Sequence, residues 1–261
     1  MTNSHWNTRI LHWDKITPPM RPHKNSINAQ VDIVGNNTEN VLLLGVTPEL
    51  AKAFDNVTAV DIEPKMIEHI WPGDDETHKA ILGDWFTTDL PVNHFSAVVG
   101  DGSLNMVKFP FDAKVLMSRL LDLMRPGGIA AVRVFSRPET PVLFSDLISN
   151  YHKYSWHAFR CYLNMYLGHC YGTNIPSKLM LQEFDKIFPD RQELSEKTGW
   201  DINEIGNSVD AYRNSMTQTS YPTQQHWMSS VPDSAVDVQL VQVAGYELAE
   251  HYPILTFRKP I

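Results

Sequence analysis

The segment Val41-Leu42-Leu43-Leu44-Gly45-Val46-Thr47-Pro48-Glu49-Leu50 decides the fold. A short, fully apolar run that ends at a glycine is typical of a strand buried on both faces of a sheet. Pro48 suits the first turn of a helix, because the missing N–H is not needed there and its φ is already helical. The segment therefore predicts a buried strand, a tight turn and a helix in immediate succession.

The alternation of strands and helices continues after this segment. Four more apolar strands are expected, at residues 57–60, 80–82, 95–99 and 129–135. Helices that start near Pro64 and Ala113 separate them. Such an alternation over about one hundred residues indicates a parallel sheet with helices on both faces.

The remaining segments complete a single α/β domain. Residues 1–38 form an N-terminal helical arm, 39–135 the cofactor-binding half, 136–232 a mostly helical insert, and 233–261 a terminal strand pair. The two last strands, 236–244 and 253–258, are expected to pair antiparallel because few residues separate them. We predict a doubly wound, Rossmann-like, seven-stranded sheet that is mostly parallel, has an antiparallel last strand and carries a helical cap before the last two strands.

The arm contains a helical repeat of large side chains. Trp6, Ile10, Trp13 and Ile16 recur at steps of three and four, which indicates a short amphipathic helix. A helix of that length is marginal by itself, so the tryptophans must contact something. The arm is expected either to pack on the core or to act as a lid over a ligand site.

Composition excludes several classes of protein. The 261 residues carry a formal net charge of −8, which opposes an electrostatic grip on nucleic acid or on an anionic membrane. No apolar run approaches the roughly 20 residues needed to span a bilayer. The first residues do not read as a signal peptide. We therefore expect a cytoplasmic protein that acts without a nucleic acid or membrane partner.

The strand ends indicate a nucleoside cofactor without phosphates. Ligands of open parallel sheets bind beyond the carboxyl ends of the strands. A dinucleotide site needs G-x-G-x-x-G there, but this turn has one glycine, a proline without an N–H, and the charge of Glu49 where a phosphate would lie. No Walker-type phosphate loop occurs either. An acidic helix start tolerates a ligand that carries an ammonium or sulfonium group.

Two aspartates follow the next strands. Asp61 suits a bidentate hydrogen bond to ribose hydroxyls, although it also suits a helix cap. Asp84 suits an adenine amino group, with Trp85 or Ile62 against the face of the ring, although aspartate is also a common turn residue.

The order of these segments resembles the class I S-adenosylmethionine-dependent methyltransferases. It looks especially like a bacterial branch whose first motif contains G-V-T-P-E-L, here residues 45–50, and the resemblance covers almost the whole chain. Other stretches similar to that group are Arg21-Pro22, 71–74, 100–103, 210–213 and 245–250. The second and third glycines of the wider superfamily, and an acid two residues before Gly45, are missing.

The resemblance implies S-adenosylmethionine as cofactor and assigns its contacts. Gly45 and Thr47 would flank the methionine part, Asp61 would hold the ribose, and Ile62 would pack on adenine. The stretch Gly83-Asp84-Trp85 would bound the base. Asp101 and Gly102 would lie beside the sulfonium and the acceptor.

The arm and the insert are expected to build the acceptor pocket. The tyrosines between Tyr151 and Tyr171 are candidates to line it, or else they form the core of the cap. Asp101, His157 and Tyr171 are the candidates for a general base. No His-x-x-x-His pair occurs on a predicted helix, so no metal site is expected.

The sequence favours methyl transfer to a small-molecule acceptor. Two alternatives stay open. One is an enzyme that consumes the same cofactor without methylating, as a cyclase or lyase that releases methylthioadenosine. The other is a non-catalytic module that binds a nucleoside.

Overall fold

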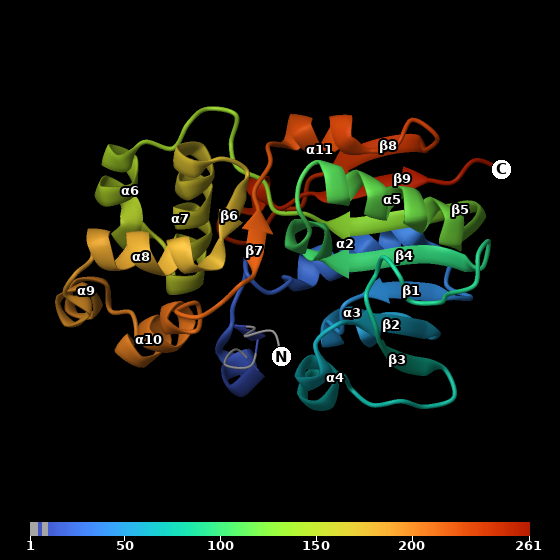
Figure 1. Ribbon diagram of the computed structural model, residues 1–261, viewed down its shortest axis with the longest axis horizontal. Coiled ribbons are helices and arrows are strands. Elements are labelled where there is room, and N and C mark those ends of the chain that lie inside the picture. Colours follow the sequence, from blue (N-terminus) through green and yellow to red (C-terminus); the bar gives the residue numbers. More distant parts are fainter. Residues whose placement is uncertain (1–4, 7–9) are drawn as a thin grey trace.

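A computed structural model describes residues 5–6 and 10–261 of the chain. The described residues form a sheet with helices on both faces and a helical insert at one side of it (Figure 1). The main sheet contains β1 (Val41–Leu44), β2 (Val57–Asp61), β3 (His78–Leu82), β4 (Phe95–Asp101), β5 (Met124–Arg133), β8 (Val236–Val241) and β9 (Ile254–Arg258).

The strand order is β3-β2-β1-β4-β5-β9-β8. The first five strands of this order are parallel, and β9 pairs antiparallel with both β5 and β8. This confirms the predicted seven-stranded sheet. The order reverses at β1, because β2 lies on one side of it and β4 on the other.

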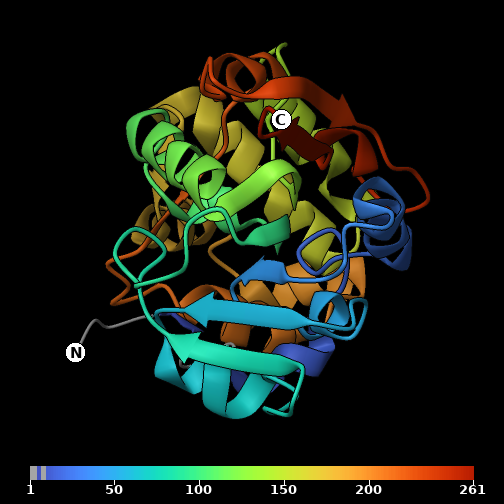
Figure 2. The same cartoon turned by 90° about the vertical axis from the view of Figure 1, so that its right-hand side faces the viewer.

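Residues of β1 alternate between two separate cores. Leu42 and Leu44 belong to the core beneath α5 (Phe111–Leu123) and α11 (Gln224–Ser230). Val41 and Leu43 belong to the opposite core. That second core lies under α2 (Lys24–Val34), α3 (Pro48–Ala51) and α4 (Pro64–Ile70). The uniformly apolar sequence of this strand follows from burial on both faces, and Figure 2 shows α5 and α2 on opposite sides of the sheet.

The insert has its own aromatic core. Its helices are α6 (Phe144–Asn150), α7 (Trp156–Tyr171), α8 (Ser177–Ile187), α9 (Arg191–Thr198) and α10 (Ile202–Asp210). Trp200 packs on Trp156 and Phe159, with ring centroids 5.3 and 5.1 Å away. Among the described helices none is both long and apolar enough to cross a membrane.

The structure differs from the sequence prediction at three places. A two-stranded sheet of β6 (Asn174–Pro176) and β7 (Gln218–Ser220) links the insert to the main sheet. The helix α11 falls within the stretch predicted as insert but packs on β8. The arm contains α2, which was not predicted, and residues 10–15 of the predicted amphipathic helix form a 3₁₀ helix, η1 (Ile10–Lys15). Residues 7–9 of the helical repeat lie outside the described residues.

Asn105, in the 3₁₀ helix η2 (Ser103–Met106), joins the main sheet to the insert. Its Nδ2 donates to the carbonyls of Phe135, at 2.8 Å, and Ser220, at 2.6 Å, while its Oδ1 accepts from the N–H of Phe135 at 2.9 Å. The side chain is fully buried. These bonds hold β7 against the edge of the sheet where β4 ends.

We predict that Asn105→Ala lowers the free energy of unfolding by about 3 kcal/mol, because buried backbone groups lose their partners. Urea denaturation followed by circular dichroism measures the change. The exposed Asn203→Ala is the control and should change stability by less than about 0.5 kcal/mol. Equal stabilities of the two variants would contradict the role of Asn105.

Candidate active site

A cavity of about 510 Å³ lies at the carboxyl ends of the strands, where the strand order reverses. The ends of β1 to β4, the insert and the arm all contribute to its wall. Every residue predicted to bind the cofactor lines it: Gly45, Thr47, Asp61, Ile62, Gly83, Asp84, Trp85, Asp101 and Gly102. A pocket of this size accommodates a ligand as large as a nucleoside cofactor.

Asp61 ends β2 and faces the turn after β1. Its Oδ1 accepts from the N–H of Glu63 at 2.8 Å, but the N-cap residue of α4 is Glu63, so the helix-cap alternative for Asp61 is wrong. Gly45 has φ +95°, and a Cβ there would lie 3.7 Å from Oδ2 of Asp61. Burial raises the pKa of Asp61 from 3.8 to about 6, although the N–H of Glu63 lowers it. Burial of the ionised carboxylate therefore costs free energy in the ligand-free protein. Hydrogen bonds donated by hydroxyl groups of a ligand would offset that cost.

Beside Asp61, the cavity is lined by two large apolar side chains, Ile62 and Trp85. Ile62 is 68% exposed although it is a large apolar side chain. The indole Nε1 of Trp85 donates to the carbonyl of Val60 at 2.7 Å, which fixes the orientation of its ring. Asp84 caps its own turn by accepting from the N–H of Phe86 at 2.8 Å. Apolar side chains next to a carboxylate suit a flat ring with a polar edge.

The floor of the cavity is a buried ion pair. Nε of Arg133 donates to Oδ1 of Asp101, and the two side chains are 0% and 6% exposed. Burial raises the pKa of Asp101, and Arg133 opposes that rise. Gly102 has φ +67°, and a Cβ there would lie 2.4 Å from the ring of Phe135, so this position requires glycine.

The arm closes the cavity with residues that sequence reasoning missed as site residues. Arg21 lines the cavity, and its Nε donates to Oε1 of Glu49 in the first turn of α3. Its guanidinium carbon lies 5.2 Å from the ring centroid of Trp13, which also lines the cavity. The stretch Arg21-Pro22 was noted as a similarity, but nothing in the sequence placed it near Glu49.

Two polar atoms of this arm contact are buried and have no hydrogen-bond partner among the described residues. They are Oε2 of Glu49, an acceptor, and Nε1 of Trp13, a donor. Buried polar atoms are rarely left unsatisfied, so each of the two needs a water molecule or a ligand group as its partner; Trp13 lines the cavity, whereas Glu49 lies behind its lining.

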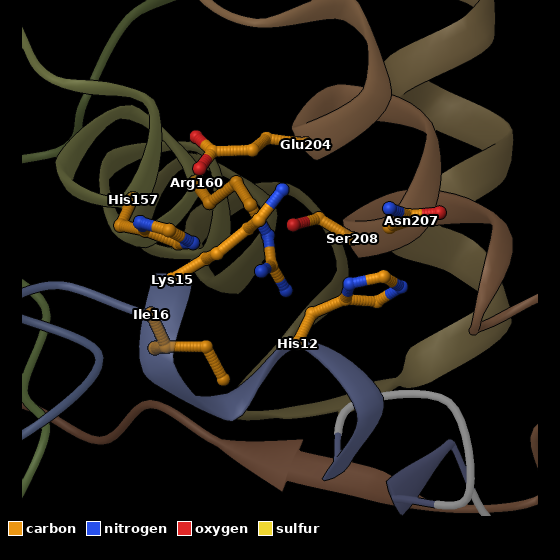
Figure 3. A pocket seen from close by; sticks show the side chains of 8 residues that line it. All are labelled: His12, Lys15, Ile16, His157, Arg160, Glu204, Asn207 and Ser208. Carbon is orange, nitrogen blue, oxygen red and sulfur yellow. The ribbon is translucent and has the colours of Figure 1, made fainter.

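His157 lies outside the large cavity. Its Nδ1 contacts Thr17, with 3.3 Å to the N–H and 3.0 Å to Oγ1, so it joins the insert to the arm. With Arg160 and His12 it lines a separate cavity of about 20 Å³, which holds no more than a water molecule (Figure 3). His157 therefore does not reach the site where Asp101 lies.

Tyr171 also lies away from the large cavity. It is the last residue of α7 and is 51% exposed. A hydrogen bond to Glu183 raises its pKa, which disfavours a role as a base. The other tyrosines of the predicted cluster pack against the aromatic core of the insert, namely Tyr151, Tyr154, Tyr162 and Tyr166. Tyr212 and Tyr221 line the cavity instead.

The cavity has an acidic side. Asp61, Glu63 and Asp84 project from the strand ends, and Asp101 is neutralised by Arg133. Pro48 occupies the start of α3 next to the charge of Glu49, so this helix offers no cradle for a pyrophosphate. Across the described residues no group of three His, Cys, Asp or Glu side chains is placed to hold a metal ion. The fold and the site define an α/β enzyme for a nucleoside cofactor that carries positive charge.

Comparisons with known proteins agree with this class. Residues 45–132 match the family model described as a methyltransferase domain. A protein of Mycobacterium tuberculosis, described as an uncharacterized methyltransferase, is 30% identical over 164 residues, which are 59% of this chain and 69% of that protein. The chain therefore belongs to the methyltransferase family, and its fold is that of the class I S-adenosylmethionine-dependent members.

Solved structures with lower identity show the same fold. The 1,6-didemethyltoxoflavin-N1-methyltransferase of Burkholderia thailandensis has a TM-score of 0.54 at 14% identity, over 99% of this chain and 87% of that one. A Rhodobacter sphaeroides protein, provisionally described as a zinc-dependent alcohol dehydrogenase, has a TM-score of 0.60 at 13% identity, over 98% and 97%. At such identities the likeness concerns the fold alone.

We predict that Asp61→Asn stabilises the ligand-free protein at pH 7.5. The pKa of Asp61 is raised above its ordinary value, so the stability associated with its proton is fully present below about pH 4 and is lost as pH rises through 6. Asparagine cannot lose a proton, and the gain at pH 7.5 should be about 1–3 kcal/mol.

Urea denaturation at pH 4 and 7.5 tests this expectation, with the exposed Asp32→Asn as control. The gain in free energy of unfolding that Asp61→Asn gives over the wild type should shrink toward zero at pH 4. An advantage that is absent at pH 7.5, or equal at both pH values, would show that burial does not perturb Asp61.

Proposed function

We propose that the enzyme transfers the methyl group of S-adenosylmethionine to a small-molecule acceptor enclosed between the sheet, the insert and the arm. The observation that carries the proposal is the cavity between the sheet, the insert and the arm, with its acidic sheet side and two unsatisfied polar atoms at the arm. When bound, S-adenosylmethionine supplies an electrophilic methyl carbon on a sulfonium.

The adenosine part suits the ends of β2 and β3. In this proposal Asp61 accepts from the ribose hydroxyls, Asp84 accepts from the adenine amino group, and the ring lies between Ile62 and Trp85. The exposed apolar surface of Ile62 would then be covered.

The amino-acid end of S-adenosylmethionine suits the place where Arg21 of the arm contacts Glu49 and Trp13. Oε2 of Glu49 would accept from the ammonium, while Nε1 of Trp13 and the guanidinium of Arg21 would donate to the carboxylate. A donor and an acceptor that are both buried without partners complement a zwitterion. This contact would replace the missing glycines and the missing acid of the wider superfamily.

The remaining site residues would position the reactants and exclude water. Asp101 and Gly102 lie beside the cavity floor, and the pairing of Asp101 with Arg133 keeps this floor rigid. The insert and the arm cover the site, so the acceptor approaches from a fixed direction.

A small acceptor fits the charge of the protein better than a nucleic acid does. The net charge is −8 and the sheet side of the cavity carries carboxylates, both of which would repel a phosphate backbone. We expect the reaction to take place in the cytoplasm.

Product analysis by mass spectrometry tests the proposal. The protein is incubated with S-adenosylmethionine, with and without a small-molecule cell extract. We expect S-adenosylhomocysteine only when the extract is present. Methylthioadenosine formed without extract would contradict methyl transfer and indicate the cyclase or lyase alternative.

We predict that Trp13→Phe weakens binding of S-adenosylmethionine about tenfold, because a charge-assisted hydrogen bond to its carboxylate is lost. Decarboxylated S-adenosylmethionine lacks this carboxylate, so its affinity should stay within twofold of the wild-type value. Titration calorimetry measures both, with Trp71→Phe as control. Equal weakening of the two compounds would mean that Trp13 has only a packing role.

A further inference from the structure

The Asp84 turn, residues 83–88, follows β3 and is closed on itself. The carbonyl of Asp84 accepts from the N–H of Thr87 at 3.1 Å, and from the N–H and Oγ1 of Thr88 at 2.9 and 2.7 Å. A Cβ on Gly83 would lie 2.1 Å from Oγ1 of Thr88, so a side chain there would displace the threonine from this bond. The turn is therefore a single compact unit.

On one side the Asp84 turn is held by β2. Nε1 of Trp85 donates to the carbonyl of Val60 at 2.7 Å, and the N–H of Gly83 donates to the carbonyl of Asp61 at 2.9 Å. Both bonds lie at the same strand end. They do not by themselves fix the tilt of the turn about that end.

On the other side the turn is held by a residue of α5. Nε of Arg119 donates to the carbonyl of Trp85 at 2.9 Å, and its Nη2 donates to the carbonyl of Thr88. The guanidinium is planar and presents its donors at a fixed spacing. Arg119 thus ties two separate carbonyls of the Asp84 turn to one helix, which opposes a tilt.

The contacts of Arg119 are unlike those of a surface arginine. The side chain is partly buried, whereas its neighbour Ser118 is exposed. Asp122 lies three residues further on the same helix, a spacing that allows an ion pair. In the part of the chain that the structure describes, however, Arg119 has no ion pair with a carboxylate, and both of its hydrogen bonds end on the Asp84 turn.

The Asp84 turn presents one carboxylate oxygen to a ligand. Oδ1 of Asp84 accepts from the N–H of Phe86 at 2.8 Å, whereas Oδ2 accepts no hydrogen bond from a described residue. Asp84 lines the large cavity and Arg119 lies behind it. Hydrogen bonds depend on direction, and a binding group must be held to within about 0.5 Å. A residue that fixes the turn therefore fixes the direction from which Oδ2 can accept.

We propose that Arg119 is the positioning residue of the Asp84 turn and that, through this turn, it sets a preference of the site for adenine over hypoxanthine. The inference rests on the proposed binding of S-adenosylmethionine. Adenine carries an amino group that can donate to Oδ2 of Asp84. Hypoxanthine carries a carbonyl oxygen at the same place, and two acceptors repel each other.

Base selectivity separates this role from a purely structural one. Titration calorimetry compares S-adenosylhomocysteine with S-inosylhomocysteine, in which a carbonyl oxygen replaces the amino group. We expect the wild type to bind the adenine compound at least tenfold more tightly. In Arg119→Met the affinity for S-adenosylhomocysteine should fall at least fivefold, while that for S-inosylhomocysteine stays within twofold of the wild-type value.

Two further variants serve as comparisons. Arg119→Lys keeps a donor that can reach one of the two carbonyls, so its selectivity should lie between those of Arg119→Met and the wild type. It also carries the test if Arg119→Met does not fold, which circular dichroism shows. Arg125 bonds Glu39 and Asn37 away from the cavity, so Arg125→Met should keep the wild-type selectivity.

The outcomes distinguish this inference from the proposed function. Wild-type selectivity in both Arg119 variants, or an equal loss of affinity for the two compounds, would overturn the positioning role and leave cofactor binding intact. A wild type that binds both compounds equally would remove the contact of Asp84 with the base and the inference with it. A wild type that binds neither compound would contradict the proposed function as well.

Discussion

The buried ion pair of Asp101 and Arg133 is the interaction on which the site depends. The two residues are register partners on the adjacent strands β4 and β5. Nη1 of Arg133 also donates to the carbonyl of Pro19 at 3.0 Å, and its guanidinium carbon lies 5.2 and 5.3 Å from the ring centroids of Phe135 and Tyr252. One guanidinium thus fixes the cavity floor, the arm and the segment before β9. Loss of either partner would leave an uncompensated buried charge, which typically costs 3–5 kcal/mol.

Three parts of the chain contribute different side chains to the cavity: the sheet, the insert and the arm. The sheet presents carboxylates and the apolar side chains of Ile62 and Trp85 at its strand ends, which suit a nucleoside with a positive charge. The residues that the insert contributes to the cavity, such as Asn164, Thr217 and Tyr221, carry no formal charge. The arm contacts both parts, through Arg21 on Glu49 and through His5 on Thr217. In the proposed function, the arm would therefore contact both the cofactor side and the insert side of the cavity.

The sheet and the position of Gly45, Asp61 and Asp84 at one cavity could be predicted from the sequence, because both depend on local patterns. Apolar strands that end in Gly45, Asp61 or Gly83 must bring those residues to one edge of a parallel sheet. The acceptor side depends on contacts between distant segments, which no local pattern encodes. Helix periodicity does not tell which face of α7 meets the cavity, so Asn164 was missed and the neighbouring tyrosines were proposed in its place. His157 and Tyr171 were chosen for their chemistry, but the helix directs one toward Thr17 and places the other at its exposed end.

The central claim is that the arm and the strand ends bind one cofactor together. Hydrogen–deuterium exchange with and without S-adenosylhomocysteine tests it most directly, because the measurement follows separate segments of the chain. The account predicts that the ligand slows exchange in residues 10–23 of the arm as well as in residues 45–47 and 61–63 at the strand ends. Slower exchange at the strand ends with no change in the arm would contradict it.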